Sequence, residues 1–225
     1  MTLPESISVV RSRISAACAR AGRGDDDVTM IAVTKTVPVD VVRRAREAGI
    51  DHFAENYANE LTAKSSAVPA TWHFIGRLQR GTASRVADHA DVVHSAEPGA
   101  ALRRLEARVA RRGDTIPCLA QVDFTGARHG VRPEDLVAFL TDLQPSAGVS
   151  IVGLMTLPPW GDPEATRPYF ARLRELRDGL REGFPGVREL SMGMSGDYEV
   201  AVEEGAKMVR IGTALFGPRP ENRKH

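Results

Sequence analysis

The stretch Val28-Thr29-Met30-Ile31-Ala32-Val33-Thr34, which ends against Lys35, decides the fold class of this chain. An unbroken apolar run of this length is typical of a parallel strand covered by helices on both faces. A helical pattern over residues 4–21 precedes the run, and another over residues 38–48 follows it, because apolar positions recur there three to four residues apart. The surroundings of the run therefore predict an α/β protein.

The same alternation continues to the C-terminus. Strand character is found at residues 28–34, 51–54, 72–75, 91–95, 116–124, 150–156, 189–192 and 208–211, and helical patterns at 38–48, 57–64, 82–88, 99–112, 133–144, 163–182 and 197–204. Eight such strands predict a single (β/α)8 barrel of the TIM type with an extra N-terminal helix, forming one domain over residues 1–217. A doubly wound open sheet uses the same alternation and is the alternative. Residues 218–225 are expected to form a disordered tail.

Composition excludes several classes of partner. Thirty basic and twenty-nine acidic residues give a formal net charge of +1, so no overall field attracts nucleic acid or an anionic membrane. Cys18 and Cys118 lie far apart without a Cys/His cluster, which implies neither a disulfide framework nor a metal site. No segment approaches the roughly 18 apolar residues of a membrane span, and no signal pattern opens the chain. We expect a cytoplasmic monomer that binds a small ligand.

Lys35 is the first candidate for chemistry. Ile31, Val33 and Lys35 alternate onto one face of the strand, so Lys35 caps the barrel interior if the other two fill it. Desolvation and nearby positive charge lower the pKa of a lysine and give the neutral amine that attacks an aldehyde. A snorkelling lysine at the strand end is the alternative. Other residues expected at the same mouth, because they follow strands, are Glu55, Asn56, Gly76, Ser95, Thr156, Ser195 and Gly212,.

Two Gly-bearing strand ends predict a phosphate site. Residues 191–195 read Ser-Met-Gly-Met-Ser, and residues 210–213 read Arg-Ile-Gly-Thr. Small residues after a strand leave backbone amides free to converge on an oxyanion, and barrel phosphate sites often use the loops after strands seven and eight. Ser195, Gly212 and Thr213 are the candidates; an ordinary helix N-cap is the alternative for Ser195. A phosphate-binding site that faces a lysine predicts a phosphorylated aldehyde as the ligand.

Further polar groups lie in apolar strands. Arg210 needs a partner if it is buried, either a carboxylate or a ligand nitrogen. Asn56 and His73 are candidates for orienting a ligand, although each can equally be a satisfied structural residue.

Together these segments resemble a known family, the pyridoxal 5′-phosphate (PLP) homeostasis proteins of the YggS/PROSC type, over residues 28–217. The resemblance rests on Ala32-Val33-Thr34-Lys35, Glu55-Asn56-Tyr57, Trp72-His73-Phe74-Ile75-Gly76-Arg77-Leu78-Gln79, Gly153-Leu154-Met155-Thr156, Leu190-Ser191-Met192-Gly193-Met194-Ser195-Gly196-Asp197 and Val209-Arg210-Ile211-Gly212. This chain departs from the family pattern at Ala54, where the family often has Gly, and at Arg80-Gly81, near which the family often has Asn-Lys.

The resemblance implies a barrel similar to the N-terminal domain of alanine racemase, with PLP held as a Schiff base on Lys35. It also implies roles by position: Ser195 and the amides of Gly212 and Thr213 hold the phosphate, Arg210 faces the pyridine nitrogen and Asn56 lies near the ring.

Arg210 argues against strong catalysis. A protonated pyridine nitrogen makes PLP an electron sink, whereas an arginine donates to that nitrogen and keeps it unprotonated. We therefore expect a protein that buffers PLP and delivers it, with PLP-dependent apo-enzymes as possible partners. The alternatives are a PLP-dependent amino-acid racemase, with His73 or Tyr57 as the second base, and an aldolase that uses Lys35 on a sugar phosphate.

Overall fold

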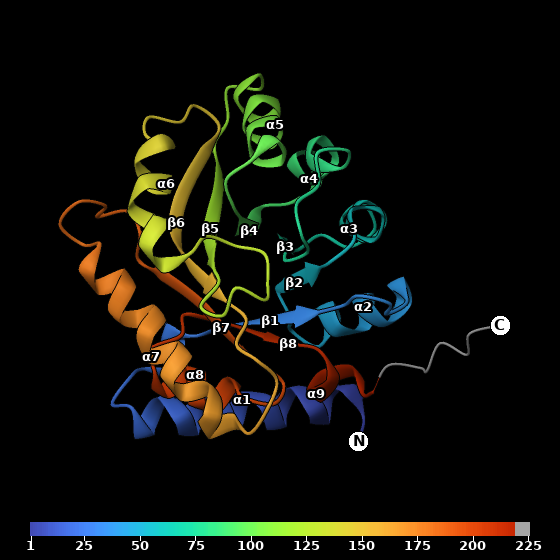
Figure 1. Ribbon diagram of the computed structural model, residues 1–225. Helices are drawn as coiled ribbons and strands as arrows, with labels where there is room; N and C mark the ends of the chain where they lie inside the picture. The colour runs from blue at the N-terminus through green and yellow to red at the C-terminus, as the bar shows by residue number, and fades with distance from the viewer. Residues whose placement is uncertain (219–225) are drawn as a thin grey trace.

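The computed structural model describes residues 1–218, and its centre is a closed barrel of eight parallel strands in the order β1 to β8 (Figure 1). The strands are β1 (Thr29–Val33), β2 (His52–Glu55), β3 (Thr71–Phe74), β4 (Val92–Ala96), β5 (Ile116–Val122), β6 (Val149–Thr156), β7 (Glu189–Met194) and β8 (Met208–Ile211). Pairing of β1 with β8, in which Ile31 lies opposite Arg210, closes the ring. The predicted barrel is thus confirmed, and the open sheet is excluded.

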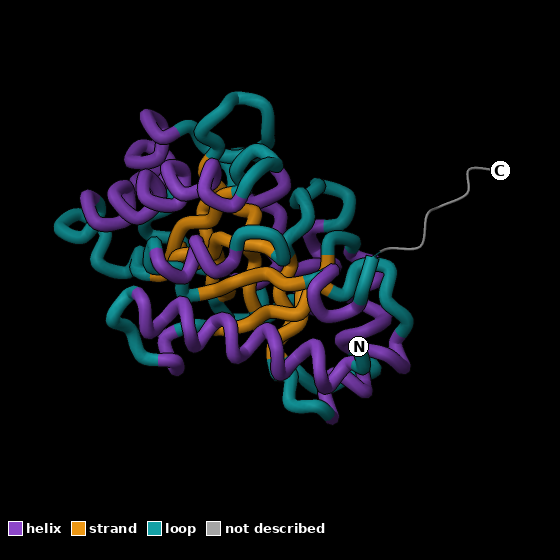
Figure 2. The backbone as a smooth tube through the Cα atoms, turned by 90° about the horizontal axis from the view of Figure 1, so that it is seen from below, coloured by secondary structure: helices purple, strands orange, loops and turns teal. Residues whose placement is uncertain are grey.

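Helices surround the strands on the outside, as the view in Figure 2 shows. They are α1 (Leu3–Arg20), α2 (Val39–Glu47), α3 (Ala58–Ser65), α4 (Ala83–His89), α5 (Ala100–Ala110), α6 (Leu136–Asp142), α7 (Pro163–Gly179), α8 (Tyr198–Glu203) and α9 (Thr213–Phe216), with 3-10 turns η1 (Asp25–Asp27) and η2 (Pro133–Asp135). The sequence patterns missed α9, because four residues are too few to show a helical period. Residues 219–225 of the predicted tail lie outside the described residues.

The barrel interior and the layer beneath the helices are separate cores. Ile31, Val33 and Ala54 pack together inside the barrel, with Ile75 and Met208 against them. The larger core lies between the strands and the helices and includes Cys18 and Cys118, which are buried and not in a disulfide. The predicted parity of β1 is therefore correct, and it directs Lys35 toward the mouth of the barrel.

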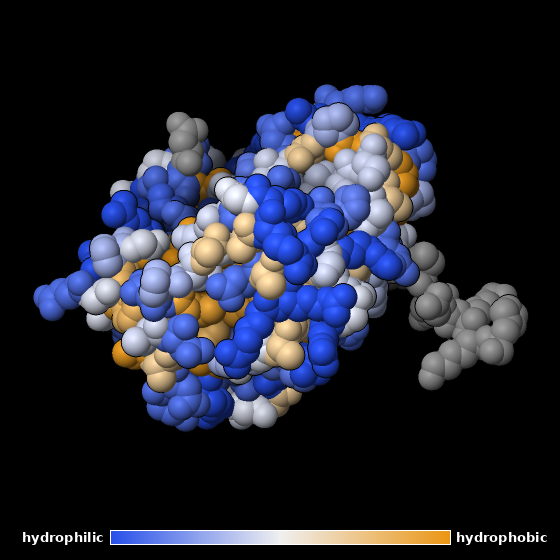
Figure 3. All heavy atoms as spheres, turned by 90° about the horizontal axis from the view of Figure 1, so that it is seen from above, coloured by the Kyte–Doolittle hydropathy of each residue, from blue (hydrophilic) through white to orange (hydrophobic). Residues whose placement is uncertain are grey.

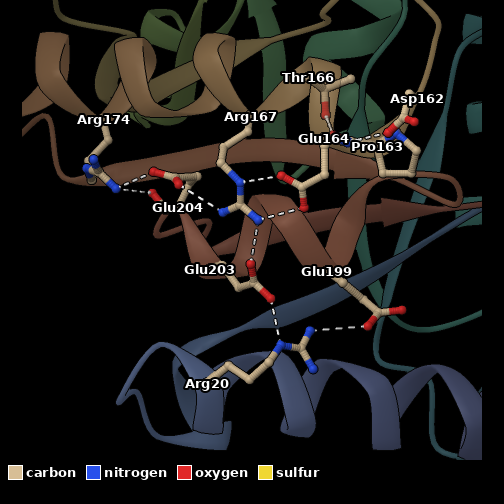
Figure 4. Close-up of polar contacts among 10 residues, drawn as sticks. All are labelled: Arg20, Asp162, Pro163, Glu164, Thr166, Arg167, Arg174, Glu199, Glu203 and Glu204. Atoms are coloured by element: carbon tan, nitrogen blue, oxygen red, sulfur yellow. Dashed lines mark hydrogen bonds and ion pairs between the residues drawn. The ribbon is translucent and has the colours of Figure 1, made fainter.

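The extra helix α1 lies along the barrel beside α8 and α9 (Figure 1). Its apolar stripe of Ile7, Val10 and Ile14 is buried. Arg20 pairs with Glu203 of α8 at 2.7 Å, and Glu203 also contacts Arg167 of α7 at 2.7 Å (Figure 4). Because these groups are partly exposed, burial of the stripe contributes more to holding α1 than the ion pairs do.

Hydrophilic side chains cover most of the face seen in Figure 3, and apolar areas lie between them. Within residues 1–218 no helix combines the length and the apolar character needed to cross a bilayer. The same residues contain no group of three or more histidine, cysteine or acidic side chains that could hold a metal ion.

Candidate functional site

A cavity of about 1250 Å³ opens where the carboxyl ends of the strands converge. The six residues predicted to bind the cofactor all line it, namely Lys35, Asn56, Ser195, Arg210, Gly212 and Thr213. They come from the ends of four strands, β1, β2, β7 and β8, and are as far apart in sequence as residues 35 and 213. The barrel therefore brings the Lys35 amine, the Arg210 guanidinium and the small residues that follow β7 and β8 to a single site.

Lys35 lies two residues beyond the end of β1, and the backbone after it is strained. Thr36 has φ 65°, in the left-handed region that non-glycine residues avoid, at a cost of about 1–3 kcal/mol. The Thr36 amide donates to Glu60 Oε2 at 2.8 Å. This contact with α3 stabilises the turn that presents the lysine.

A buried ionic cluster lies behind Lys35. Lys64 Nζ of α3 donates to Thr34 O, to Glu55 Oε1 and to Glu60 Oε2, each at 2.6 Å. Thr34 Oγ1 donates to the same Glu55 oxygen at 2.6 Å. Burial raises the pKa of Glu55, while Lys64 and Thr34 act in the opposite direction. The cluster thus fixes the residues on both sides of Lys35.

The prediction that Glu55 lies in the mouth is wrong. Side chains of a strand alternate between faces, and since Ala54 points into the barrel, Glu55 points outward to Lys64. Sequence reasoning also missed Lys64. The available signal was its spacing of four residues from Glu60 on a short helix, which is typical of an ion pair.

Asn56 carries a buried polar atom without a partner. Its Oδ1 is shielded from solvent and makes no hydrogen bond within the described residues, and the residue lines the cavity. A buried acceptor of this kind is costly unless a ligand or water satisfies it. Asn56 is therefore suited to contact a bound molecule.

Gly76 does not line the cavity, contrary to the prediction, but it supports Asn56. A Cβ at Gly76 would lie 2.0 Å from the Asn56 carbonyl oxygen, so no side chain fits. Ser95 Oγ donates to the Gly76 carbonyl at 2.5 Å, and Thr156 Oγ1 donates to the Val122 carbonyl at 2.9 Å. Ser95 and Thr156, also predicted at the mouth, therefore hold backbone in place instead.

Gly76→Ala is expected to destabilise the protein by about 1–3 kcal/mol, because the backbone around Asn56 must move to admit the new carbon. Denaturant unfolding measures the loss. Gly81→Ala is the matched control, since a Cβ there meets nothing within 4 Å. Equal stability of the two variants would contradict the close approach of Gly76 to Asn56.

Ser195 is the acceptor on which two backbone amides converge. Its Oγ accepts from Gly212 N at 3.1 Å and from Ala214 N at 3.2 Å. Convergent amides in a turn are the arrangement that binds oxyanions. The alternative of an ordinary N-cap does not apply, because α8 begins at Tyr198 and its N-cap is Asp197.

Arg210 is only 3% exposed, and its buried side is anchored. Nη1 donates to Ser191 Oγ at 2.6 Å, and Nη2 donates to the Thr156 carbonyl at 3.0 Å. Burial lowers the pKa of Arg210 to about 10, so it is charged at neutral pH. Neither anchor is a carboxylate, which leaves a charged donor at the base of the cavity.

The two candidate second bases are not among the cavity-lining residues. Tyr57 is 58% exposed, and His73 is buried between His52 and His94 inside the barrel. Burial lowers the pKa of His73 to about 3. The cavity wall does include Arg128 and Trp160, which sequence reasoning did not select because both come from loops without a strand-end pattern.

Comparison with known proteins agrees with this geometry. The family described as "Alanine racemase, N-terminal domain" matches residues 7–220. Pyridoxal phosphate homeostasis proteins from Pseudomonas aeruginosa and Aquifex aeolicus are 41% and 39% identical to the chain, which they match over 97% of its length and over 96% and 99% of their own. The structure of PipY from Synechococcus elongatus with PLP bound superposes with a TM-score of 0.85, at 34% identity, over 96% of this chain and all of PipY.

Proposed function

Because this chain belongs to the pyridoxal phosphate homeostasis proteins, a family built on the alanine racemase N-terminal domain, we propose that it holds PLP on Lys35 and takes part in PLP homeostasis. The main observation in support is that the Lys35 amine, the buried and charged Arg210 and the convergent amides near Ser195 line one cavity. One domain over residues 1–217 supplies all of these groups.

The residues present fit the cofactor. Lys35 would supply the amine for the aldehyde, and Ser195 after β7 together with the amides of Gly212 and Thr213 after β8 would hold the phosphate,. Arg210 would donate to the pyridine nitrogen, and Asn56, whose Oδ1 has no hydrogen-bond partner within the described residues, would lie near the ring. When bound, PLP supplies an electrophilic carbonyl and a ring that can accept electrons.

The charge on Arg210 supports holding the cofactor rather than using it. An arginine that stays protonated at neutral pH cannot take a proton from the ring, and its donation opposes protonation of the pyridine nitrogen,. The electron-accepting strength of the ring is then low. A racemase also needs a second base, and neither Tyr57 nor His73 lines the cavity.

Borohydride reduction of the protein incubated with PLP tests the site of attachment. Peptide mapping is expected to find the label on Lys35, because it lines the cavity while Lys64 Nζ is engaged by three acceptors. Label predominantly on Lys207 or another lysine would overturn the assignment.

Delivery to PLP-dependent apo-enzymes is the second part of the proposal. A loaded protein, freed of unbound PLP, is expected to restore activity to such an apo-enzyme in a mixing experiment. Retention of all PLP by this protein, or recovery no faster than from released cofactor, would limit its role to buffering. We further propose that it acts as a cytoplasmic monomer, which sedimentation of the loaded protein and cell fractionation test.

A further inference from the structure

A row of hydrogen-bonded side chains crosses the barrel interior and ends at Arg210. His52 Nδ1 lies 3.0 Å from His73 Nε2, and His73 Nδ1 lies 2.8 Å from His94 Nε2. His94 Nδ1 lies 2.8 Å from Ser191 Oγ, which accepts from Arg210 Nη1 at 2.6 Å. The row is continuous from one end of the barrel to the base of the cavity.

The stagger of the barrel builds this row. His52, the first residue of β2, pairs with Thr71, so His73 lies two residues further along β3. His73 pairs in turn with Val92, and His94 again lies two residues further along β4. Each histidine therefore lies closer to the mouth of the barrel than the one before it. All three point into the barrel, since every second residue of a strand faces the same side.

Arg210 sets the direction of every proton in the row. Guanidinium groups only donate, so Ser191 Oγ accepts and its single proton goes to His94 Nδ1. A neutral His94 then carries its proton on Nε2 and donates to His73 Nδ1. By the same reasoning His73 donates from Nε2 to His52 Nδ1. All three imidazoles thus have the Nε2–H tautomer.

Burial keeps these imidazoles neutral. His73 and His94 are 2% and 0% exposed, and desolvation lowers the pKa of His73 to about 3 and that of His94 well below the ordinary value. In this orientation each neutral ring turns its acceptor nitrogen toward the charge on Arg210. The row therefore adds to the attraction of the Asp197 carboxylate in compensating a buried guanidinium whose hydrogen bonds to Ser191 and to the Thr156 carbonyl are both with uncharged groups,.

We propose that His52, His73, His94 and Ser191 form a hydrogen-bond relay of fixed direction whose role is to hold Arg210 in place at the base of the cavity. They are positioning residues, because they act through Arg210 and do not line the cavity. The effect on cofactor binding rests on the proposed function, whereas the direction of the relay does not.

Nitrogen NMR of the full-length, 15N-histidine-labelled protein without added PLP tests the direction. His73 and His94 are expected to show only the Nε2–H tautomer and to stay neutral from about pH 8 to about pH 5. Exposed His129 provides the reference signal of an imidazole in contact with solvent. An Nδ1–H tautomer at either buried histidine, or its protonation in this range, would overturn the relay.

Variants then test the connection. Ser191→Ala removes the donor to His94 Nδ1 and is expected to shift the ring signals of His94 and His73, whereas Ser191→Thr keeps a hydroxyl and restores them. If Ser191→Ala does not fold, His52→Leu at the half-buried end removes the acceptor of His73 and is expected to shift that signal. Unchanged signals in the folded variant contradict the relay.

The last measurement is PLP titration followed by visible absorbance. Ser191→Ala is expected to bind PLP about tenfold more weakly than wild type, because a hydrogen bond to a charged group is lost. Its absorbance band is also expected to be shifted. Ser191→Thr is expected to resemble wild type in both respects. If wild-type protein acquires no visible absorbance band with PLP, the proposed function is wrong, but the assignment of the histidine tautomers still holds. If Ser191→Ala and wild type bind PLP with equal affinity and show the same spectrum, the row does not position Arg210, and the proposed function is unaffected.

Discussion

Lys35→Ala is expected to lose completely the visible absorbance band that wild-type protein acquires with PLP, and to lose borohydride-trapped label at the site. Lys35 is the cavity-lining residue proposed to attach PLP, and without it the groups proposed to hold the phosphate and the ring remain but cannot form the covalent bond. Absorbance titration and the mass of the reduced protein measure the loss. The unfolding free energy is expected to change little, because Lys35 is partly exposed.

Lys207→Ala is the matched control for this experiment. Lys207 is also a lysine beside a strand, and its Nζ pairs with Asp27 on the surface at 3.1 Å. Its removal is expected to leave the band and the label unchanged. A band that survives Lys35→Ala at full intensity, or one that disappears in Lys207→Ala, would show that attachment occurs elsewhere.

Lys64→Met is expected to have the largest effect on stability, about 3–5 kcal/mol of unfolding free energy. The change removes the cation that Glu55 contacts in a dry environment and leaves a carboxylate with 0% side-chain exposure. Denaturant unfolding measures the loss. The double variant Glu55→Gln/Lys64→Met is expected to recover a substantial part of it, because no buried charge remains.

Lys207→Met again provides the comparison, since an exposed pair contributes only about 0–1 kcal/mol. If Lys64→Met costs no more than Lys207→Met, the buried cluster does not fix the backbone around Lys35. If the double variant is as unstable as the single one, packing of the lysine stem rather than charge explains the loss.

The main site could be predicted from sequence because a parallel barrel gathers strand ends whatever their distance along the chain. Lys35, Ser195 and Arg210 all follow or end strands with clear apolar patterns, so their convergence needed only the correct strand count. The roles of these residues came from the family resemblance, and they remain proposals for this chain.

The orientation of residues next to these strand ends was harder to predict from sequence. Glu55 and Asn56 are adjacent, yet one faces Lys64 outside the barrel and the other lines the cavity, because successive side chains alternate. His73 could not be assigned without the stagger that places it between His52 and His94. Its sequence context fits a ligand contact and an interior hydrogen bond equally well.

The left-handed turn at Thr36 has a consequence for the rate of cofactor exchange. Glu60 Oε2 accepts from both the Thr36 amide and Lys64 Nζ, and Lys64 in turn holds the Thr34 carbonyl. The chain on either side of the amine is therefore ordered when the protein folds, and a ligand that arrives does not have to order it. For the proposed role in PLP homeostasis, this order predicts that PLP is loaded and released without a preceding rearrangement of this segment.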